Sequence, residues 1–263
     1  MLTYTPDEMM TVTASRSMRN GMTCFVGIGL PSEAANLARR THAPELVLIY
    51  ESGTIGAKPD HVPLSIGDGI LAETADAVVG VPEIFNYWLQ PGRIDVGFLG
   101  AAQLDRYGNI NTTMIGASYE RPAVRLPGAG GAPEIAGACK EVVVVLRHSR
   151  RTFAERLDFV TTVGFGAGAG SRRELGLTGG GPRLVITDLG LLRPDPASRE
   201  LVLAGIYPGV SVEQVRDSTG WDLAISPDVS ELAPPSAADL IALRQMLSGE
   251  QAATASIVGG ITA

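Results

Sequence analysis

The stretch that decides the fold is LVLIYESGTIGAKP, residues 46–59. It opens with an apolar run of strand length, and the run stops at a single carboxylate, Glu51. Ser52 and Gly53 then begin a turn rich in glycine. Short apolar runs bounded by turn residues are typical of strands buried on both faces. We therefore predict a strand over 44–50 that delivers a carboxylate to its end.

The same alternation of apolar runs and helical patterns continues along the chain. Strands are predicted over 22–29, 44–50, 94–103, 141–146 and 183–188, and helices over 8–20, 31–40, 82–90, 210–220 and 236–247. Alternation of this kind is typical of the α/β class, with an open, largely parallel sheet and helices on both faces. No linker interrupts it, so we expect a single domain over 1–263, with a tail at 248–263 that frays.

Composition excludes several classes of function. The formal net charge of −7 argues against a nucleic-acid partner, which requires a basic footprint. No apolar run approaches the roughly 20 residues of a membrane helix, and the N-terminus lacks the pattern of a signal peptide. The three histidines and two cysteines lack metal-ligand spacing, so no metal site is expected. We expect a cytoplasmic protein without a membrane partner.

Glu51 has two interpretations when read from the residues alone. Glutamate in a loop is usually solvated, and that reading stays open. The alternative is chemistry, because open α/β sheets place their sites at the carboxyl ends of parallel strands. The apolar residues before Glu51 would partly desolvate it, which raises the pKa of a carboxyl group.

Two glycine-rich motifs flank strands. VGIGLP, residues 26–31, could place a helix N-terminus near an anion, or could be a tight packing turn; it lacks the third glycine of a dinucleotide fingerprint. GAAQLDRYGNINTT, residues 100–113, carries Gln103, Asn109 and Asn111. It is either a polar turn or a ligand clamp, and the residues favour neither.

A third glycine-rich motif is LPGAGGAPEIA, residues 126–136. Gly128, Gly130 and Gly131 could present consecutive N–H groups to an oxyanion, which needs preorganised donors and no side chain. The alternative is a flexible surface loop. Two long segments, 106–133 and 164–181, resist assignment to helix or strand, and loops of this length are usually functional or disordered.

Several motifs in this order resemble the B (β) subunit of the class I CoA-transferases, in the glutaconate CoA-transferase-like branch. The resemblance covers residues 5–243. It rests on NGMTCFVGIGLPSEAANLAR, LVLIYESGTIGAKP, PLSIGDG, RIDVGFLGAAQLDRYGNINTT, VRLPGAGGAPEIA, DFVTTVGFG and YPGVSVEQVRDSTGWDL.

The resemblance implies covalent catalysis by Glu51. This carboxylate would attack an acyl-CoA thioester, give an anhydride, and then carry CoA as a glutamyl thioester until a second acid takes it over. Gly130 and Gly131 would supply the oxyanion donors, and Gln103, Asn109 and Asn111 would line the CoA channel. CoA is then a substrate, and no cofactor is expected.

The implied reaction moves CoA from succinyl-CoA to 3-oxoadipate, as in the breakdown of aromatic compounds. The acceptor could instead be glutaconate or another short dicarboxylate, and relatives of this fold hydrolyse or decarboxylate acyl-CoAs. The resemblance also implies an A subunit as partner, in a hetero-oligomer in which this chain alone is inactive. Basic groups for the anionic substrates would come from that partner or from Lys58, Arg106 or Arg172. A non-catalytic partner chain and a nucleotide-binding oxidoreductase are the competing classes.

Overall fold

The computed structural model describes residues 3–260, with side chains described for residues 3–248. Contacts within the chain define two compact units, which we describe separately. Unit 1 comprises residues 1–84 and 235–263, and unit 2 comprises residues 85–234. The single domain over 1–263 stays a prediction. The predicted fraying at 248–263 lies almost wholly outside the residues whose side chains are described.

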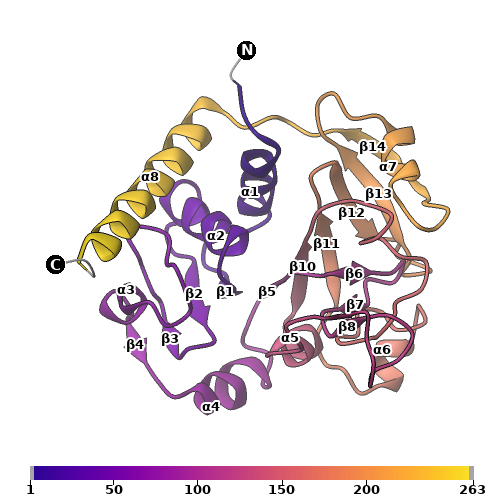
Figure 1. Cartoon of the computed structure of the whole chain (residues 1–263), viewed down its shortest axis with the longest axis horizontal. Helices are drawn as coiled ribbons and strands as arrows, with labels where there is room; N and C mark the ends of the chain where they lie inside the picture. The colour runs from indigo at the N-terminus through magenta and orange to yellow at the C-terminus, as the bar shows by residue number, and fades with distance from the viewer. Residues whose placement is uncertain (1–2, 261–263) are drawn as a thin grey trace. The chain divides into compact units, whose positions relative to one another are not determined.

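Unit 1 is a small sheet with helices. Its elements are α1 (Pro6–Arg16), β1 (Thr23–Val26), α2 (Leu30–Arg40), β2 (Val47–Tyr50), β3 (Thr54–Ile55), α3 (Gly69–Glu73), β4 (Ala77–Val78), α4 (Val81–Glu83) and α8 (Ala237–Gly260). The strands run in the order β1-β2-β3-β4 (Figure 1). The β1–β2 pair is parallel, whereas β3 is antiparallel to both of its neighbours, β2 and β4.

Helices α1, α2 and α8 pack on one another beside this sheet (Figure 1). Their shared core consists of Val12, Leu37, Val62, Leu243 and Met246. A capping box starts α1, because Thr5 and Glu8 each accept the other's backbone N–H. The Glu8 carboxylate also pairs with Arg244, which ties α8 to the start of α1.

Unit 2 contains six strands of the main sheet and two separate two-stranded sheets, β6–β7 and β8–β9. Its elements are η1 (Ile84–Leu89, a π-helical turn beginning at the boundary), β5 (Val96–Leu99), β6 (Gln103–Leu104), β7 (Ile110–Asn111), β8 (Met114–Ile115), β9 (Val124–Arg125), α5 (Ala132–Ala138), β10 (Glu141–Val145), α6 (Ser171–Glu174), β11 (Pro182–Ile186), β12 (Gly190–Pro194), β13 (Leu201–Ile206), α7 (Val212–Asp217) and β14 (Ile225–Glu231). The main strands follow the order β5-β10-β11-β12-β13-β14. β5, β10 and β11 are parallel to one another. β12 is antiparallel to both of its neighbours, β11 and β13, and β14 is parallel to β13.

The predicted α/β class with a largely parallel sheet is confirmed. Every predicted strand and helix has a counterpart, although α1 ends at Arg16 and α7 at Asp217, earlier than the patterns indicate. β12, β13 and β14 were not predicted. β13 (LVLAGI) is apolar throughout, although buried and half-buried residues alternate along it, whereas the centre of β10 is buried at three successive residues.

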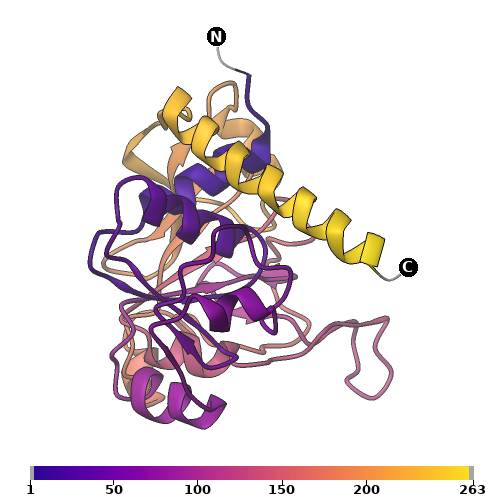
Figure 2. The same ribbon diagram turned by 90° about the vertical axis from the view of Figure 1, so that its left-hand side faces the viewer.

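The two unassigned loops contain short elements. Segment 106–133 holds β7 and the β8–β9 hairpin, and Figure 2 shows this hairpin extending away from the body of unit 2. Segment 164–181 contains only the single turn of α6.

Both cysteines are buried, and burial raises the pKa of Cys139 to about 12, so it packs as a neutral thiol. Among the described residues, no helix is long and apolar enough to cross a bilayer. No cluster of three or more potential metal ligands occurs in that same part of the chain.

Candidate active site

Glu51 stands in a tight turn that closes the β2–β3 hairpin. The N–H of Gly53 donates to the carbonyl of Tyr50 at 3.0 Å, so Glu51 takes the second position of a four-residue turn. The strand before it is the parallel strand β2, as the sequence predicts. Glu51 is half-buried, and its side chain is therefore reachable from solvent at the carboxyl end of β2.

Gly53 is required by the backbone around this turn. Its φ is +112°, and a Cβ built there would lie 2.0 Å from the carbonyl oxygen of Val79. The two residues are joined by a hydrogen bond from the Val79 N–H to the Gly53 carbonyl at 2.9 Å. Any side chain would break this approach. The glycine after Glu51 therefore holds the turn in place, whether or not it also leaves room for substrate.

A buried polar network lies directly behind Glu51. The Tyr50 hydroxyl is 3.0 Å from Ser32 Oγ, and Asn36 Nδ2 donates to the Ser32 carbonyl at 3.0 Å. All three side chains are almost completely inaccessible to solvent. Burial raises the pKa of Tyr50 above its usual value, and its bonds to Ser32 and Asn36 partly oppose that shift. The network fixes the last residue of β2 against the first turn of α2.

This network also accounts for part of the VGIGLP motif. Gly29, with φ +80°, precedes the first turn of α2. Ser32, which stands where a dinucleotide fingerprint has its third glycine, points into the protein and meets Tyr50. In unit 1 the motif therefore serves packing between β1, β2 and α2.

In the two asparagines of GAAQLDRYGNINTT, every donor and acceptor of the side-chain amide is hydrogen-bonded to other groups of the chain. Asn109 donates to Asp105 Oδ2 and the Gly166 carbonyl, and its Oδ1 accepts the N–H groups of Gly164 and Gly166. An asparagine amide offers two donors and two acceptor lone pairs. Asn109 thus has nothing left for a ligand, and it fastens the 105–109 turn to the start of the glycine segment.

Asn111 is saturated in the same way. Its Nδ2 donates to Gln103 Oε1 and the Met114 carbonyl, while its Oδ1 accepts the N–H groups of Thr113 and Met114. Gln103 Nε2 donates once, to Asp158 at 3.2 Å, which leaves one amide N–H without a partner among the described residues. Of the three amides, Gln103 alone retains a free donor.

Gln103 lines a pocket of about 600 Å³ in unit 2. It is called pocket A here. Its lining residues are Ala102, Gln103, Ile115, Val124, Leu126, Ser149, Arg150, Arg151, Thr152 and Ala154. The pocket lies where β5 and β10 end, because Gln103 follows β5 and the arginines follow β10. These strands are parallel neighbours, so their carboxyl ends share one edge of the sheet.

The glycine loop before α5 leaves backbone donors free. The Gly128 N–H is used by the Thr112 carbonyl at 2.8 Å. Those of Gly130 and Gly131, in contrast, donate to no group among the described residues. Gly130 is exposed and has φ +50°. Gly131 is buried, so the loop presents the exposed N–H of Gly130 and holds the unused N–H of Gly131 beside it, and an oxyanion site requires such preorganised donors. Helix α5 begins at Ala132, directly after these two glycines.

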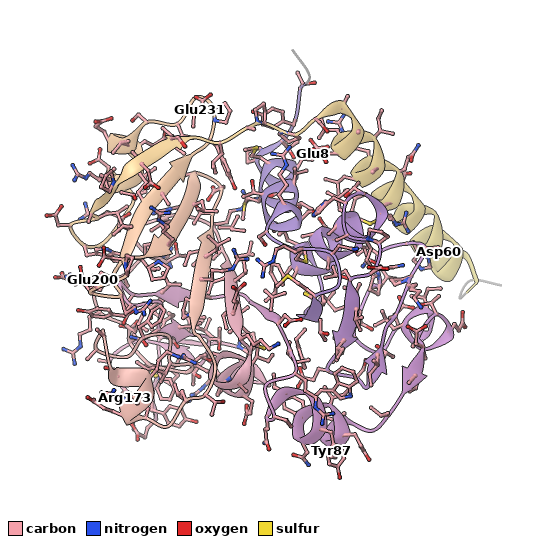
Figure 3. All side chains as sticks on the ribbon, turned by 180° about the vertical axis from the view of Figure 1, so that it is seen from behind. Glu8, Asp60, Tyr87, Arg173, Glu200 and Glu231 are labelled. Carbon is pink, nitrogen blue, oxygen red and sulfur yellow. The ribbon has the colours of Figure 1, made fainter. Side chains whose placement is uncertain are left out.

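The three candidate cations are already engaged. Lys58 pairs with Asp76, and Arg106 lies 3.9 and 3.8 Å from Glu155 and Glu200. Arg172 is buried and donates to four backbone carbonyls, those of Ala136, Gly137, Gly164 and Gly179. Arg173 beside it is exposed (Figure 3). Arg172 therefore holds the glycine-rich segment in place and is not positioned to bind an anionic ligand.

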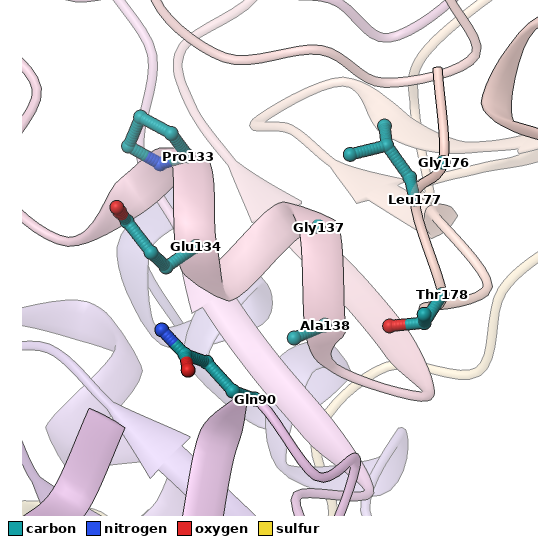
Figure 4. Close-up of a pocket in the computed structure, with 8 residues that line it drawn as sticks. All are labelled: Gln90, Pro133, Glu134, Gly137, Ala138, Gly176, Leu177 and Thr178. Atoms are coloured by element: carbon teal, nitrogen blue, oxygen red, sulfur yellow. The ribbon is translucent and has the colours of Figure 1, made fainter. Parts of the chain in front are cut away.

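A second pocket of about 320 Å³ lies between α5 and residues 176–178 (Figure 4). Its lining includes Glu134, Gln90 and Thr178 but no basic side chain. It offers nothing that would neutralise an anionic ligand.

The predicted site residues fall in both units. Glu51 belongs to unit 1, whereas Gln103, Asn109, Asn111, Gly130 and Gly131 belong to unit 2. Sequence reasoning missed the Arg150–Arg151 pair. The signal was present, since two adjacent arginines follow the apolar run 141–146 at the end where sites are expected.

Comparisons with known proteins agree on a family. The Coenzyme A transferase family matches residues 7–218. The B subunit of the 3-oxoadipate CoA-transferase of Pseudomonas knackmussii is 59% identical over 246 residues, covering 94% of each chain. The B subunit of the glutaconate CoA-transferase of Acidaminococcus fermentans is 38% identical over 256 residues, covering 95% of this chain and 94% of the relative.

Solved structures give the same result. The crystal structure of glutaconate coenzyme A-transferase from Acidaminococcus fermentans superimposes with a TM-score of 0.89 at 36% identity, covering 95% of this chain and 96% of that one. The decarboxylase AibA/AibB superimposes with a TM-score of 0.80 at 24% identity, covering 93% of this chain and 95% of that one, which shows a shared fold alone. The chain belongs to the coenzyme A transferase family.

Proposed function

We propose that this chain is the B subunit of a CoA-transferase that moves CoA from succinyl-CoA to 3-oxoadipate. The observation that carries the substrate is the 59% identity, over 94% of both chains, to the B subunit of a 3-oxoadipate CoA-transferase. Two other relatives are also named as B subunits of CoA-transferases, which supports an A subunit as partner. CoA enters this reaction as a substrate, with no further cofactor.

Glu51 is the proposed nucleophile. Its carboxylate attacks the thioester carbonyl and expels CoA thiolate, leaving an acyl-glutamyl anhydride. The thiolate then attacks the glutamyl carbonyl, releases succinate and forms the glutamyl-CoA thioester. The acceptor carboxylate then attacks the glutamyl carbonyl and expels CoA thiolate, which gives a second anhydride. The thiolate attacks the acceptor's acyl carbonyl of this anhydride, forms the new acyl-CoA and releases the Glu51 carboxylate. Splitting the exchange in this way replaces one difficult step by several easier ones.

Each of these attacks places negative charge on a carbonyl oxygen. The free N–H groups of Gly130 and Gly131 are the proposed donors to that charge. The turn that holds Glu51 and the Tyr50 network behind it restrict the backbone of the nucleophile before substrate binds. Such restriction lowers the entropic cost of reaching the attack geometry.

The test uses the chain assembled with the A subunit of a 3-oxoadipate CoA-transferase. Succinyl-CoA is supplied with 3-oxoadipate, glutaconate and acetate in parallel. We expect the highest kcat/KM with 3-oxoadipate, and loss of transfer in Glu51→Gln but not in Glu45→Gln, a matched exposed glutamate. A preference for glutaconate would replace the acceptor, and full activity of Glu51→Gln would remove the mechanism.

A further inference from the structure

A third pocket of unit 2, with a volume of about 200 Å³, is lined by three arginines and is called pocket B here. Its walls are the side chains of Phe165, Arg172, Arg173 and Arg199 and the backbone of the glycine-rich segment 164–181. Among the described residues no acidic side chain lines it, in contrast to the pocket beside α5. The walls of pocket B therefore carry positive charge and no negative charge.

Arg172 contributes a buried charge that no carboxylate neutralises. Its side chain is 8% exposed, and its hydrogen bonds all run to neutral backbone carbonyls. Burial lowers the pKa of Arg172, and among the described residues it has no ion pair. A guanidinium group nevertheless stays protonated in a protein. Because a buried charge is costly without an opposite charge nearby, this part of the chain favours an anion in pocket B.

The other two guanidinium groups are able to bond to such an anion. Arg173 and Arg199 are both exposed, and within the described part of the chain neither side chain donates a hydrogen bond or lies within ion-pair distance of a carboxylate (Figure 3). Arg199 lies over the ring of the buried Phe165, with its Cζ 5.5 Å from the ring centroid. Stacking uses the face of a guanidinium group and leaves the N–H donors in its plane available.

The backbone fixes Arg199 at the edge of the pocket. Its φ of +68° is the one positive value of a non-glycine residue in the described part of the chain, and this conformation is uncommon for a residue with a Cβ. Asp195 supports the turn, because its Oδ1 accepts the N–H groups of Ala197 and Ser198 at 2.9 and 2.8 Å. Gly168 lets the glycine-rich segment approach this turn, since a Cβ there would lie 3.1 Å from the Ser198 carbonyl oxygen.

We infer that pocket B binds a phosphate-sized oxyanion, with the guanidinium groups of Arg173 and Arg199 as its donors and the charge of Arg172 beside it. The volume is below the roughly 300–1,000 Å³ that is usual for organic ligands, which favours a small anion over a whole cofactor. The paired N–H donors of a guanidinium group match the oxygens of phosphate. This site is additional to the proposed transfer of CoA, which neither consumes nor releases free phosphate.

A bound anion would join the glycine-rich segment to the turn at 195–199, because Arg173 belongs to the first and Arg199 to the second. The segment is already held from within unit 2, where Asn109 accepts the N–H of Gly164. Occupancy of pocket B should therefore slow amide hydrogen exchange across residues 164–181.

The test measures binding of inorganic phosphate by isothermal titration calorimetry at constant ionic strength, with the full chain alone and assembled with the A subunit. In Arg173→Gln/Arg199→Gln we expect the Kd for phosphate to rise about tenfold or more, because charge-assisted bonds are lost. Arg121→Gln/Arg156→Gln removes the same charge from exposed arginines of unit 2 that do not line pocket B. This control should keep the Kd within about twofold, because distant charges are screened. Phosphate should slow exchange at 164–181 in the native chain and the control but not in Arg173→Gln/Arg199→Gln.

Four results would overturn the inference. No binding of phosphate by the native chain at millimolar concentrations would remove the site. An equal Kd in the two double variants would place phosphate elsewhere. Competition between CoA and phosphate for Arg173 and Arg199 would make pocket B part of the substrate site. Binding that is lost on assembly would assign these arginines to the contact with the A subunit. Transfer of CoA to 3-oxoadipate is measured separately, so a failure of the proposed function would not be mistaken for any of these.

Discussion

Replacing Asn109 by alanine separates the two readings of the polar motif at residues 100–113. The substitution removes four hydrogen bonds from a side chain that is 5% exposed. Three of them join neutral groups and one joins the Asp105 carboxylate. At about 1 kcal/mol for each neutral bond and about 2 kcal/mol for the charged one, the upper limit is about 5 kcal/mol. Relaxation and entry of water reduce it, so we expect a loss of roughly 3–4 kcal/mol.

Urea unfolding followed by tryptophan fluorescence measures this loss. Trp88 and Trp221 are the only tryptophans of the chain, and both lie in unit 2 with Asn109. Asn20→Ala is the control. Asn20 is exposed, and among the described residues its side chain bonds only to Glu45, so its loss should cost less than about 1 kcal/mol. If Asn109→Ala unfolds like the native chain yet raises the KM for succinyl-CoA about tenfold, Asn109 does not act as a structural residue. That result would restore the ligand clamp.

Three further predictions concern the turn and the core. Gly53→Ala should destabilise the chain by more than about 1 kcal/mol and lower transfer, because its Cβ would overlap the Val79 carbonyl. Gly21→Ala is the control, because Gly21 has φ +78° and open space around it, so that only the backbone conformation is strained. Equal urea midpoints for the two variants would contradict this prediction. Tyr50→Phe leaves Ser32 short of a partner and should lower kcat more than it raises KM, with a stability loss of about 1–3 kcal/mol; a kcat unchanged in steady-state assays would mean that the network does not position Glu51. Burial lowers the pKa of His148 from 6.5 to about 4. Between pH 6.5 and pH 4 the unfolded chain therefore binds a proton at this residue that the native chain does not bind. The free energy of unfolding should fall by up to about 1.4 kcal/mol per pH unit over this range. His148→Gln should remove that part of the slope in urea titrations at pH 4.5 to 7, and identical slopes would contradict the assignment.

Local patterns were enough to predict much of the fold. The run before Glu51 and the turn after it appear in the sequence, so β2 and the place of the carboxylate could be predicted. The helix over 31–40 could be predicted because Pro31 suits a first turn.

Roles that depend on distant partners could not be predicted. Asn109 is saturated by groups 55 and 57 residues away, and Arg172 by carbonyls on α5. A sequence does not show whether an amide or guanidinium side chain is free to bind a ligand. Only the folded chain shows which of these side chains already donate all their N–H groups within the protein. The same limit explains why Arg172 was named among the candidate cations, although its guanidinium group is fully used by backbone carbonyls.

The most direct test of the account is the chemical identity of the covalent intermediate. The complex with the A subunit is incubated with succinyl-CoA without acceptor, treated with borohydride or hydroxylamine, digested and mapped by mass spectrometry. We expect a reduced or hydroxamate-bearing side chain at Glu51 that disappears when 3-oxoadipate is added before the trapping reagent. A modification at any other residue of this chain, or on the A subunit, would contradict it.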